Sequence, residues 1–241
     1  TIFKAQRYKV WEGDLRANDT ITISITYNVT LTATSWKMNA STSGSVDDVP
    51  PEFHYYMDEE WLISPRQVAN LSAEIVGEET DVYTIIKYIY RWMRKNIEYR
   101  SEGADLRPCL ETLDSGWGDG DDQAILFASM ARAVGVPVSV VVGPVYDPDE
   151  DRWSTRMWNN VLIPLEEGGL QVATVDVAMG RFLFRDPYRI TQWVSTGDGD
   201  DLKGIYDGWS YSYGYPGKIP LVSSTESYQT LRLRTEGEVK V

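Results

Sequence analysis

A helix without a polar face constrains this chain more than any other feature. Nine of the 13 residues from Asp122 to Val134 are apolar, and they would lie nearly all round the helix. Such a helix is stable only when other elements surround it, so it belongs in the middle of a domain. Gly135 follows it and is a residue that typically ends helices. The sequence therefore predicts a buried central helix over residues 122–134.

Two amphipathic helices are predicted before the central helix. The first, over residues 64–76, begins with Ser64 as N-cap and Pro65 in its first turn. The second, over residues 81–96, places its apolar residues on one side at helical spacing. Strands are expected after the central helix, where β-branched and alternating apolar residues gather, at 136–142, 157–163 and 170–175. Helices followed by strands indicate the α+β class.

Both ends of the chain are predicted to be β. Apolar and polar residues alternate strictly from Thr20 to Thr34, as in a half-buried strand, and Lys9–Asp14 is its expected hairpin partner. The last segment, Leu231–Val241, alternates in the same way. We therefore divide the chain into an N-terminal β-strand element, a core and a C-terminal β segment, over residues 1–48, 49–210 and 211–241.

Charge and cysteine content exclude several functional classes. The chain has 241 residues and a net charge of −13, which repels phosphate backbones and disfavours nucleic acid as a partner. Cys109 is the only cysteine, so the chain can form no internal disulfide. No apolar run reaches the length of about 18 residues that a transmembrane helix needs, so no membrane-spanning segment is expected.

The first third of the chain is rich in glycosylation acceptor sequences. Four Asn-X-Ser/Thr sequons begin at Asn18, Asn28, Asn39 and Asn70, where about one is expected by chance from this composition. Thr-rich strands can produce sequons by accident. The alternative is a glycosylated surface, which favours an extracellular or cell-envelope protein whose partners include glycans.

The segment around the central helix resembles the transglutaminase-like family, which has a papain-like fold. Gly118–Ala124 is similar to the family's Gly-Asp-Cys-Asp turn, and Ala133–Pro137 to its Ala-Leu-Gly-Ile-Pro helix ending. The stretch Tyr88–Tyr99 looks like the preceding helix. Thr155–Val161 and Leu170–Asp176 match the family's His-Ala-Trp and Trp-x-x-x-Asp strands. The resemblance covers about residues 60–190 and implies a central helix packed on an antiparallel sheet.

The resemblance also assigns three catalytic positions. Family members use a Cys at the start of the central helix, where the helix N-terminus lowers the thiol pKa, with a His as base and an Asp that orients it. Gly120, Arg156 and Asp176 stand at these positions. Glycine has no side chain to attack with, and a guanidinium stays protonated near neutral pH. The chain is therefore expected to be a pseudoenzyme with no catalytic residue and no cofactor.

Three further expectations concern the same site. Arg156 is expected to form an ion pair with Asp176 in place of the His–Asp hydrogen bond. A relocated site would need both Cys109 and His54, which we interpret instead as an inert thiol and an ordinary histidine. The alternative to a pseudoenzyme is a cysteine-independent hydrolase that uses carboxylates of the 119–122 turn, namely Asp119, Asp121 and Asp122.

Two other segments are candidate binding sites. Asp147, Asp149 and Asp151 alternate as at the start of a calcium loop, although Arg152 stands where such a loop needs Gly and Trp158 where it needs Glu. Solvated acidic turns are the alternative to bound Ca²⁺. Alternating aromatic residues suggest a sugar or protein contact surface, or else one face of a core strand: Trp209, Tyr211, Tyr213 and Tyr215.

Taken together, these features favour a non-catalytic extracellular or cell-envelope module with a binding or structural role. The two β ends would suit a subunit of a surface layer or filament, with protein partners that include copies of itself joined by β-strand contacts.

Overall fold

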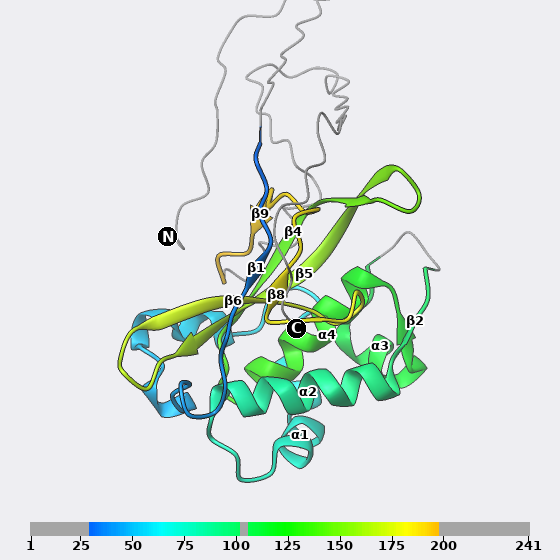
Figure 1. Ribbon diagram of the computed structural model, residues 1–241. Coiled ribbons are helices and arrows are strands. Elements are labelled where there is room, and N and C mark those ends of the chain that lie inside the picture. Colours follow the sequence, from blue (N-terminus) through cyan, green and yellow to red (C-terminus); the bar gives the residue numbers. More distant parts are fainter. Residues whose placement is uncertain (1–28, 102–105, 198–241) are drawn as a thin grey trace, which may run out of the picture. The chain divides into compact units, whose positions relative to one another are not determined.

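The computed structural model describes residues 29–101 and 106–197, drawn in colour in Figure 1. The chain divides into two units, Thr1–Tyr206 and Asp207–Val241, and the described residues all belong to the first. The predicted N-terminal hairpin, apart from the end of its second strand, and the predicted C-terminal β segment lie outside the described residues. The described end of the predicted strand Thr20–Thr34 is wrong for residues 29–33, which are not in a strand, and only Thr34 belongs to one. The other parts of these elements, and the domain boundaries at 48 and 210, stay predictions.

The three predicted helices are confirmed as α1 (Pro65–Val76), α2 (Val82–Asn96) and α4 (Gly120–Arg132). The side chain of Asp81 caps α2 by accepting a hydrogen bond from the Thr84 amide at 2.7 Å. Helix α4 begins two residues earlier than predicted because Asp119 is its N-cap. Among the described helices, α2 is the longest with 15 residues, and none is long and apolar enough to span a membrane.

Short elements that the sequence analysis did not predict connect these helices. They are the helix α3 (Cys109–Ser115) and two 3-10 helices, η1 (Val46–Asp48) and η2 (Pro51–Met57). The pairs β1 (Thr34–Ser35) with β8 (Phe184–Arg185) and β2 (Glu98–Tyr99) with β3 (Trp117–Gly118) each form a two-stranded sheet.

The predicted antiparallel sheet is confirmed, with five strands in the order β7-β6-β5-β4-β9. The central strands β4 and β5 are longer than expected because they form one hairpin that pairs from Val138 with Val161 to Asp147 with Arg152. The five strands are β4 (Val138–Asp147), β5 (Arg152–Pro164), β6 (Leu170–Asp176), β7 (Arg181–Phe182) and β9 (Trp193–Val194).

Helix α4 lies between the sheet and the other helices, as the sequence pattern predicted. In Figure 1 it runs beneath β4 and β5, with α2 and α1 below it. Every residue from Asp122 to Arg132 is buried. Met157 and Val161 of β5 belong to the same apolar core as α4, whereas Trp158 packs with Val141 and Val145 in a second cluster. Successive strand residues point to opposite faces, so both faces of the sheet are covered.

Residues 186–192 form a strap that crosses the sheet at Gly143. The Tyr146 amide donates to the Tyr188 carbonyl at 2.7 Å, and the Ile190 amide donates to the Pro144 carbonyl at 2.9 Å. A Cβ at Gly143 would lie 1.9 Å from the Ile190 carbonyl oxygen, so any larger residue would displace the strap. The strap therefore depends on a glycine in the middle of a β-branched strand.

Candidate functional site

Gly120 is the first residue of α4 and lies against the sheet where the resemblance placed the nucleophile. A Cβ at this position would be 4.0 Å from the Met157 carbonyl oxygen on β5 and 4.0 Å from the Ala178 Cβ after β6. Met157, next to Arg156 on β5, and Ala178, two residues after Asp176, thus both lie beside Gly120. Neither a positive φ nor a close neighbour requires glycine here, so the fold leaves room for a side chain.

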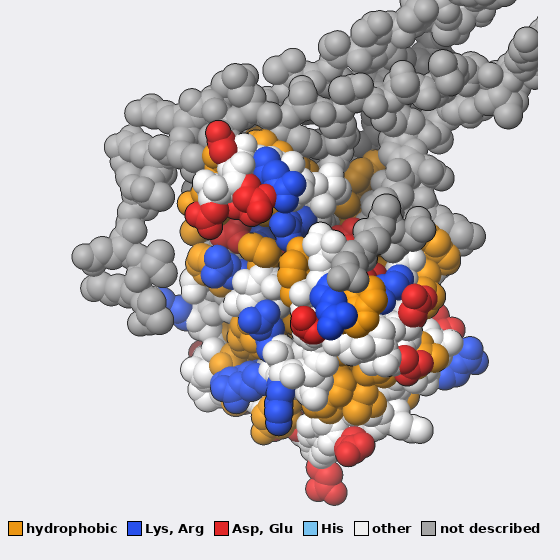
Figure 2. Space-filling view, turned by 90° about the vertical axis from the view of Figure 1, so that its right-hand side faces the viewer, with side chains coloured by type: hydrophobic (Ala, Val, Ile, Leu, Met, Phe, Trp, Pro, Cys, Tyr) orange, Lys and Arg blue, Asp and Glu red, His pale blue; other side chains and the backbone are white. Residues whose placement is uncertain are grey.

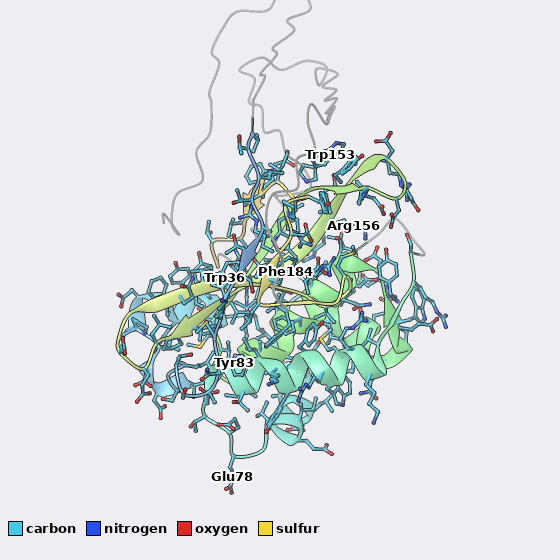
Figure 3. All side chains as sticks on the ribbon, in the orientation of Figure 1. Trp36, Glu78, Tyr83, Trp153, Arg156 and Phe184 are labelled. Atoms are coloured by element: carbon cyan, nitrogen blue, oxygen red, sulfur yellow. The ribbon has the colours of Figure 1, made fainter. Side chains whose placement is uncertain are left out.

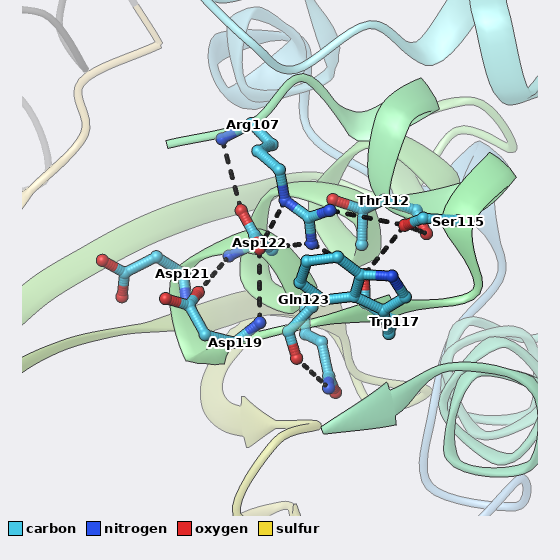
Figure 4. A network of polar contacts seen from close by, with 9 residues as sticks. Arg107, Thr112, Ser115, Trp117, Asp119, Asp121, Asp122 and Gln123 are labelled. Carbon is cyan, nitrogen blue, oxygen red and sulfur yellow. Dashed lines mark hydrogen bonds and ion pairs between the residues drawn. The ribbon is translucent and has the colours of Figure 1, made fainter. Parts of the chain in front are cut away.

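The turn before α4 is held by a reciprocal capping box. The Asp119 carboxylate accepts hydrogen bonds from the amides of Asp121 and Asp122 at 2.9 and 3.1 Å, and the Asp122 carboxylate accepts one from the Asp119 amide at 3.2 Å (Figure 4). Burial raises the pKa of Asp119, although its bonds to these amides oppose the shift. Two of the three turn carboxylates are therefore occupied in starting the helix.

Asp122 also pairs with Arg107, a residue that the sequence analysis did not single out. The Arg107 Nε and Nη2 atoms donate to Asp122 Oδ2 at 2.9 and 2.7 Å, and Nη2 donates to the Trp117 carbonyl at 2.7 Å. The guanidinium lies 4.0 Å from the centre of the Trp117 ring, as Figure 4 shows. These two hydrogen bonds to one carboxylate oxygen, together with the stacked ring, hold the turn against β3.

The predicted ion pair between Arg156 and Asp176 is wrong, because a different arginine occupies Asp176. Arg189 of the strap donates from Nη1 to Asp176 Oδ2 at 2.9 Å and from Nη2 to Asp186 Oδ2 at 2.5 Å. Its side chain is fully buried and its guanidinium lies 5.0 Å from the centre of the Trp158 ring. Burial alone would raise the pKa of Asp186, but hydrogen bonding and charge from Arg189 hold it below its usual value.

Among the described residues, the hydrogen-bond partners of Arg156 are uncharged. Its Nε donates to Ser154 Oγ at 3.2 Å, and its Nη1 lies 3.3 Å from the Tyr99 hydroxyl and 3.8 Å from Met179 Sδ. Figure 3 shows its place on β5. Since Asn159 pairs with Val175, Asp176 lies at the level of Trp158, which is two residues along β5 from Arg156. The guanidinium of Arg189, from the strap, lies at the level of Trp158 and Asp176.

Cys109 and His54 behave as expected of residues outside a catalytic site. The Cys109 side chain is fully buried, and its Sγ lies 3.8 Å from the Ser64 carbonyl oxygen. His54 Nε2 lies 3.2 Å from the Val49 carbonyl oxygen. The hydrogen bonds of the two residues lead to different parts of the backbone and do not bring sulfur and imidazole together.

The acidic hairpin tip keeps its carboxylates in local contacts. Asp147 Oδ1 accepts hydrogen bonds from the amides of Asp149 and Glu150 at 3.0 and 3.3 Å, and the Tyr146 hydroxyl donates to Asp151 Oδ1 at 2.7 Å. Within residues 29–101 and 106–197, no three acidic, His or Cys side chains come together as a metal site requires. Calcium binding by Asp147, Asp149 and Asp151 stays a prediction.

The other predicted sites are only partly described. Asn39 and Asn70 are both exposed, and Asn39 accepts a hydrogen bond from the Ser41 hydroxyl of its own sequon at 2.6 Å. Asn18, Asn28 and the aromatic residues Trp209, Tyr211, Tyr213 and Tyr215 lie outside the described part of the chain.

A surface hollow of about 560 Å³ involves none of the three catalytic positions. It lies between α1 and α3 and is lined by Gln67, Pro108, Leu110, Glu111, Asp114 and Ser115. The chemistry that the resemblance implies therefore has to be judged at Gly120, and not at this hollow.

Comparison with known proteins supports the resemblance to the transglutaminase-like family that the sequence showed. Residues 69–172 match the model of the Transglutaminase-like superfamily. Among solved structures, a candidate cysteine protease from Cytophaga hutchinsonii matches at 15% identity and a TM-score of 0.52, over 68% of this chain and 53% of that one. The chain thus spans about half the length of the Cytophaga protein. The comparison with curated proteins finds no match.

Two further solved structures match with lower TM-scores. They are the periplasmic domain of TgpA from Pseudomonas aeruginosa (18% identity, TM-score 0.36, 54% of this chain and 49% of that one) and Legionella pneumophila LapG (17% identity, TM-score 0.37, 61% and 95%). The match over residues 69–172, together with the α+β fold of a central helix on an antiparallel sheet, shows that this chain carries a transglutaminase-like core.

Proposed function

We propose that this chain is a non-catalytic transglutaminase-like module, extracellular or in the cell envelope, with a binding or structural role. The observation that carries the proposal is the composition of the matched site. Gly120 supplies no nucleophile and Arg156 supplies no base. Asp176, the third position, is paired with Arg189 and has no imidazole to orient.

The packing around Gly120 supports this interpretation over an ordinary tight turn. A Cβ there would meet its nearest neighbours at 4.0 Å, an ordinary contact distance, so packing does not exclude a cysteine. The glycine therefore reflects the absence of a nucleophile more than a requirement of the backbone. Fold alone does not specify function, and the proposal rests on these residues.

The absence of a usable thiol can be tested with iodoacetamide. The native wild-type protein should resist alkylation because Cys109 is fully buried. The variant Gly120→Cys should be alkylated in the native state, at the new thiol alone, as mapped by mass spectrometry. Alkylation of native wild-type Cys109 at the rate of the new thiol would reveal an accessible thiol and contradict the proposal.

A cysteine-independent hydrolase remains the second candidate, because burial raises the pKa of Asp119 as a catalytic carboxyl would require. The capping contacts of Asp119 and the Arg107 pair of Asp122 give both carboxylates a structural role instead. Hydrolytic turnover that is lost in Asp119→Asn, with the fold intact by circular dichroism, would favour this candidate.

The proposed extracellular or cell-envelope location depends on the sequons. Asn39 and Asn70 are exposed, so glycans at these positions would meet no packed core. The intact mass of protein from its native source should exceed the sequence mass, with modification mapped to sequon asparagines. An unmodified mass would remove the main support for this location. A role as a subunit of a surface layer or filament belongs to the same proposal. It predicts that the protein from its native source associates with itself.

A further inference from the structure

The outer face of α2 concentrates positive charge in an acidic chain. The chain has 36 acidic and 23 basic residues, yet α2 contains no acid between Val82 and Asn96. Arg91, Arg94 and Lys95, in its last two turns, are all exposed. Figure 2 faces this end of α2 and shows Lys and Arg side chains spread over the surface with hydrophobic side chains between them.

The positive charge continues from α2 to β5 across the turn at residues 177–180. Arg94 donates from Nη1 to the carbonyls of Val177 and Ala178 at 3.1 and 3.4 Å. Arg156 reaches Met179 of the same turn from the other side. We call this surface the cationic face and define it by the cations Arg91, Arg94, Lys95 and Arg156 together with the exposed side chains of Tyr99 and Met179.

The charges of the cationic face are not compensated within the described residues. None of its four cations forms an ion pair with a carboxylate there, and the described groups that Arg94 and Arg156 contact are uncharged. The nearby carboxylates of Asp122 and Asp176 are already paired with other arginines. Arg100, which is next to Tyr99, pairs with Glu98. Asp119 caps α4. Uncharged acceptors satisfy hydrogen bonds but leave the positive charge in place.

We propose that the cationic face docks an acidic segment of a polypeptide partner, an inference that rests on the proposed binding role. Arginine, tyrosine and methionine are the residue types that protein interfaces favour, and carboxylates match the guanidinium fork. The net charge of −13 does not prevent this, since salt screens charges beyond about 8 Å. A nucleic acid carries a longer run of charge, which the acidic remainder of the chain repels.

The test uses fluorescence anisotropy of labelled poly-glutamate, with poly-glutamine of the same length as the neutral probe. Wild-type protein should bind poly-glutamate, and added salt should weaken the binding. The double variant Arg94→Gln/Arg156→Gln should bind about tenfold more weakly or worse, a loss typical of removing interface charges. Arg66→Gln removes an exposed arginine of α1 that pairs with Glu59, and it should bind as the wild type does.

A second pair of substitutions protects the test against misfolding. Arg91→Gln/Lys95→Gln changes two exposed side chains and should weaken binding without changing the thermal unfolding temperature. Equal binding by the variants and wild type, or equal binding of the two probes, would overturn the proposal. Binding to phosphatidylserine vesicles with no binding of poly-glutamate would overturn it in favour of a membrane surface. If the protein fails to bind poly-glutamate and shows no enzymatic turnover, the docking proposal is wrong but the proposed non-catalytic function stands. Enzymatic turnover would contradict the proposed function itself.

Discussion

Two groups of arginines in this protein differ in how their positive charge is compensated. Beneath the surface, Arg107, Arg132 and Arg189 each form an ion pair with a carboxylate that is itself almost completely buried. On the cationic face, the acceptors of Arg94 and Arg156 within residues 29–101 and 106–197 are uncharged; Arg94 is exposed and Arg156 is half-buried. A buried charge is costly unless it is paired, whereas an exposed charge is hydrated by water. The carboxylates of Asp119, Asp122 and Asp176, which lie at or next to the positions that the resemblance assigns to catalysis, therefore take part in helix capping and ion pairs that stabilise the fold.

The largest effect is expected from removing the fully buried guanidinium of Arg189. Arg189→Gln leaves the carboxylates of Asp176 and Asp186 buried without their partner, which should lower the free energy of unfolding by about 3–5 kcal/mol. Urea unfolding monitored by circular dichroism measures the change. A loss below about 1 kcal/mol, the value of an exposed ion pair, would show that this arginine is not what stabilises the strap.

A smaller loss is expected at Arg107, whose side chain is 13% exposed. Arg107→Gln removes two hydrogen bonds to Asp122 Oδ2 and the stacking on Trp117, and should cost about 1.5–3 kcal/mol. The same urea titration measures it, with Arg66→Gln as the matched control because that arginine lies in an exposed pair. If the two variants lost equal stability, the contrast between buried and exposed arginines would fail.

Substitutions at Asp119 separate helix capping from ionisation. Asp119→Ala should destabilise by about 1 kcal/mol because it removes an N-cap, whereas Asp119→Asn keeps a good cap. The pKa of Asp119 is higher in the folded state than in the unfolded state, so the ionised carboxylate lowers the stability of the fold at neutral pH. This loss of stability disappears as the pH falls through the folded-state pKa toward the pKa of the unfolded state. The stability advantage of Asp119→Asn over wild type should therefore shrink between pH 7 and about pH 4. A constant difference over that range would contradict the raised pKa.

The smallest effect on stability is expected at Arg156. Arg156→Gln removes hydrogen bonds to uncharged groups at the surface and should change the free energy of unfolding by less than about 1 kcal/mol. The measurement is again urea unfolding, run beside Arg189→Gln. A loss as large as that of Arg189 would mean that Arg156 is part of the structural core and not of a binding surface.

Local sequence patterns were sufficient for the core and insufficient for the pairings of the site. The apolar residues of α4 and the alternation of the strands are properties of neighbouring residues, so the central helix and sheet could be predicted. Which arginine meets Asp176 depends on where the strap crosses the sheet, and no local pattern distinguishes Arg189 from Arg156. One signal was available. Gly143, within a β-branched run, indicates that another backbone approaches closely.

The central claim is that the positions of nucleophile and base in this transglutaminase-like core carry no chemistry. The most direct measurement is turnover by the purified wild-type chain on glutamine-containing peptides and protein substrates, followed by mass spectrometry. The account predicts no transamidation, no deamidation and no peptide cleavage above the buffer control. Turnover by the wild type that disappears in Cys109→Ala would contradict it, because the buried thiol would then be the nucleophile of a working enzyme.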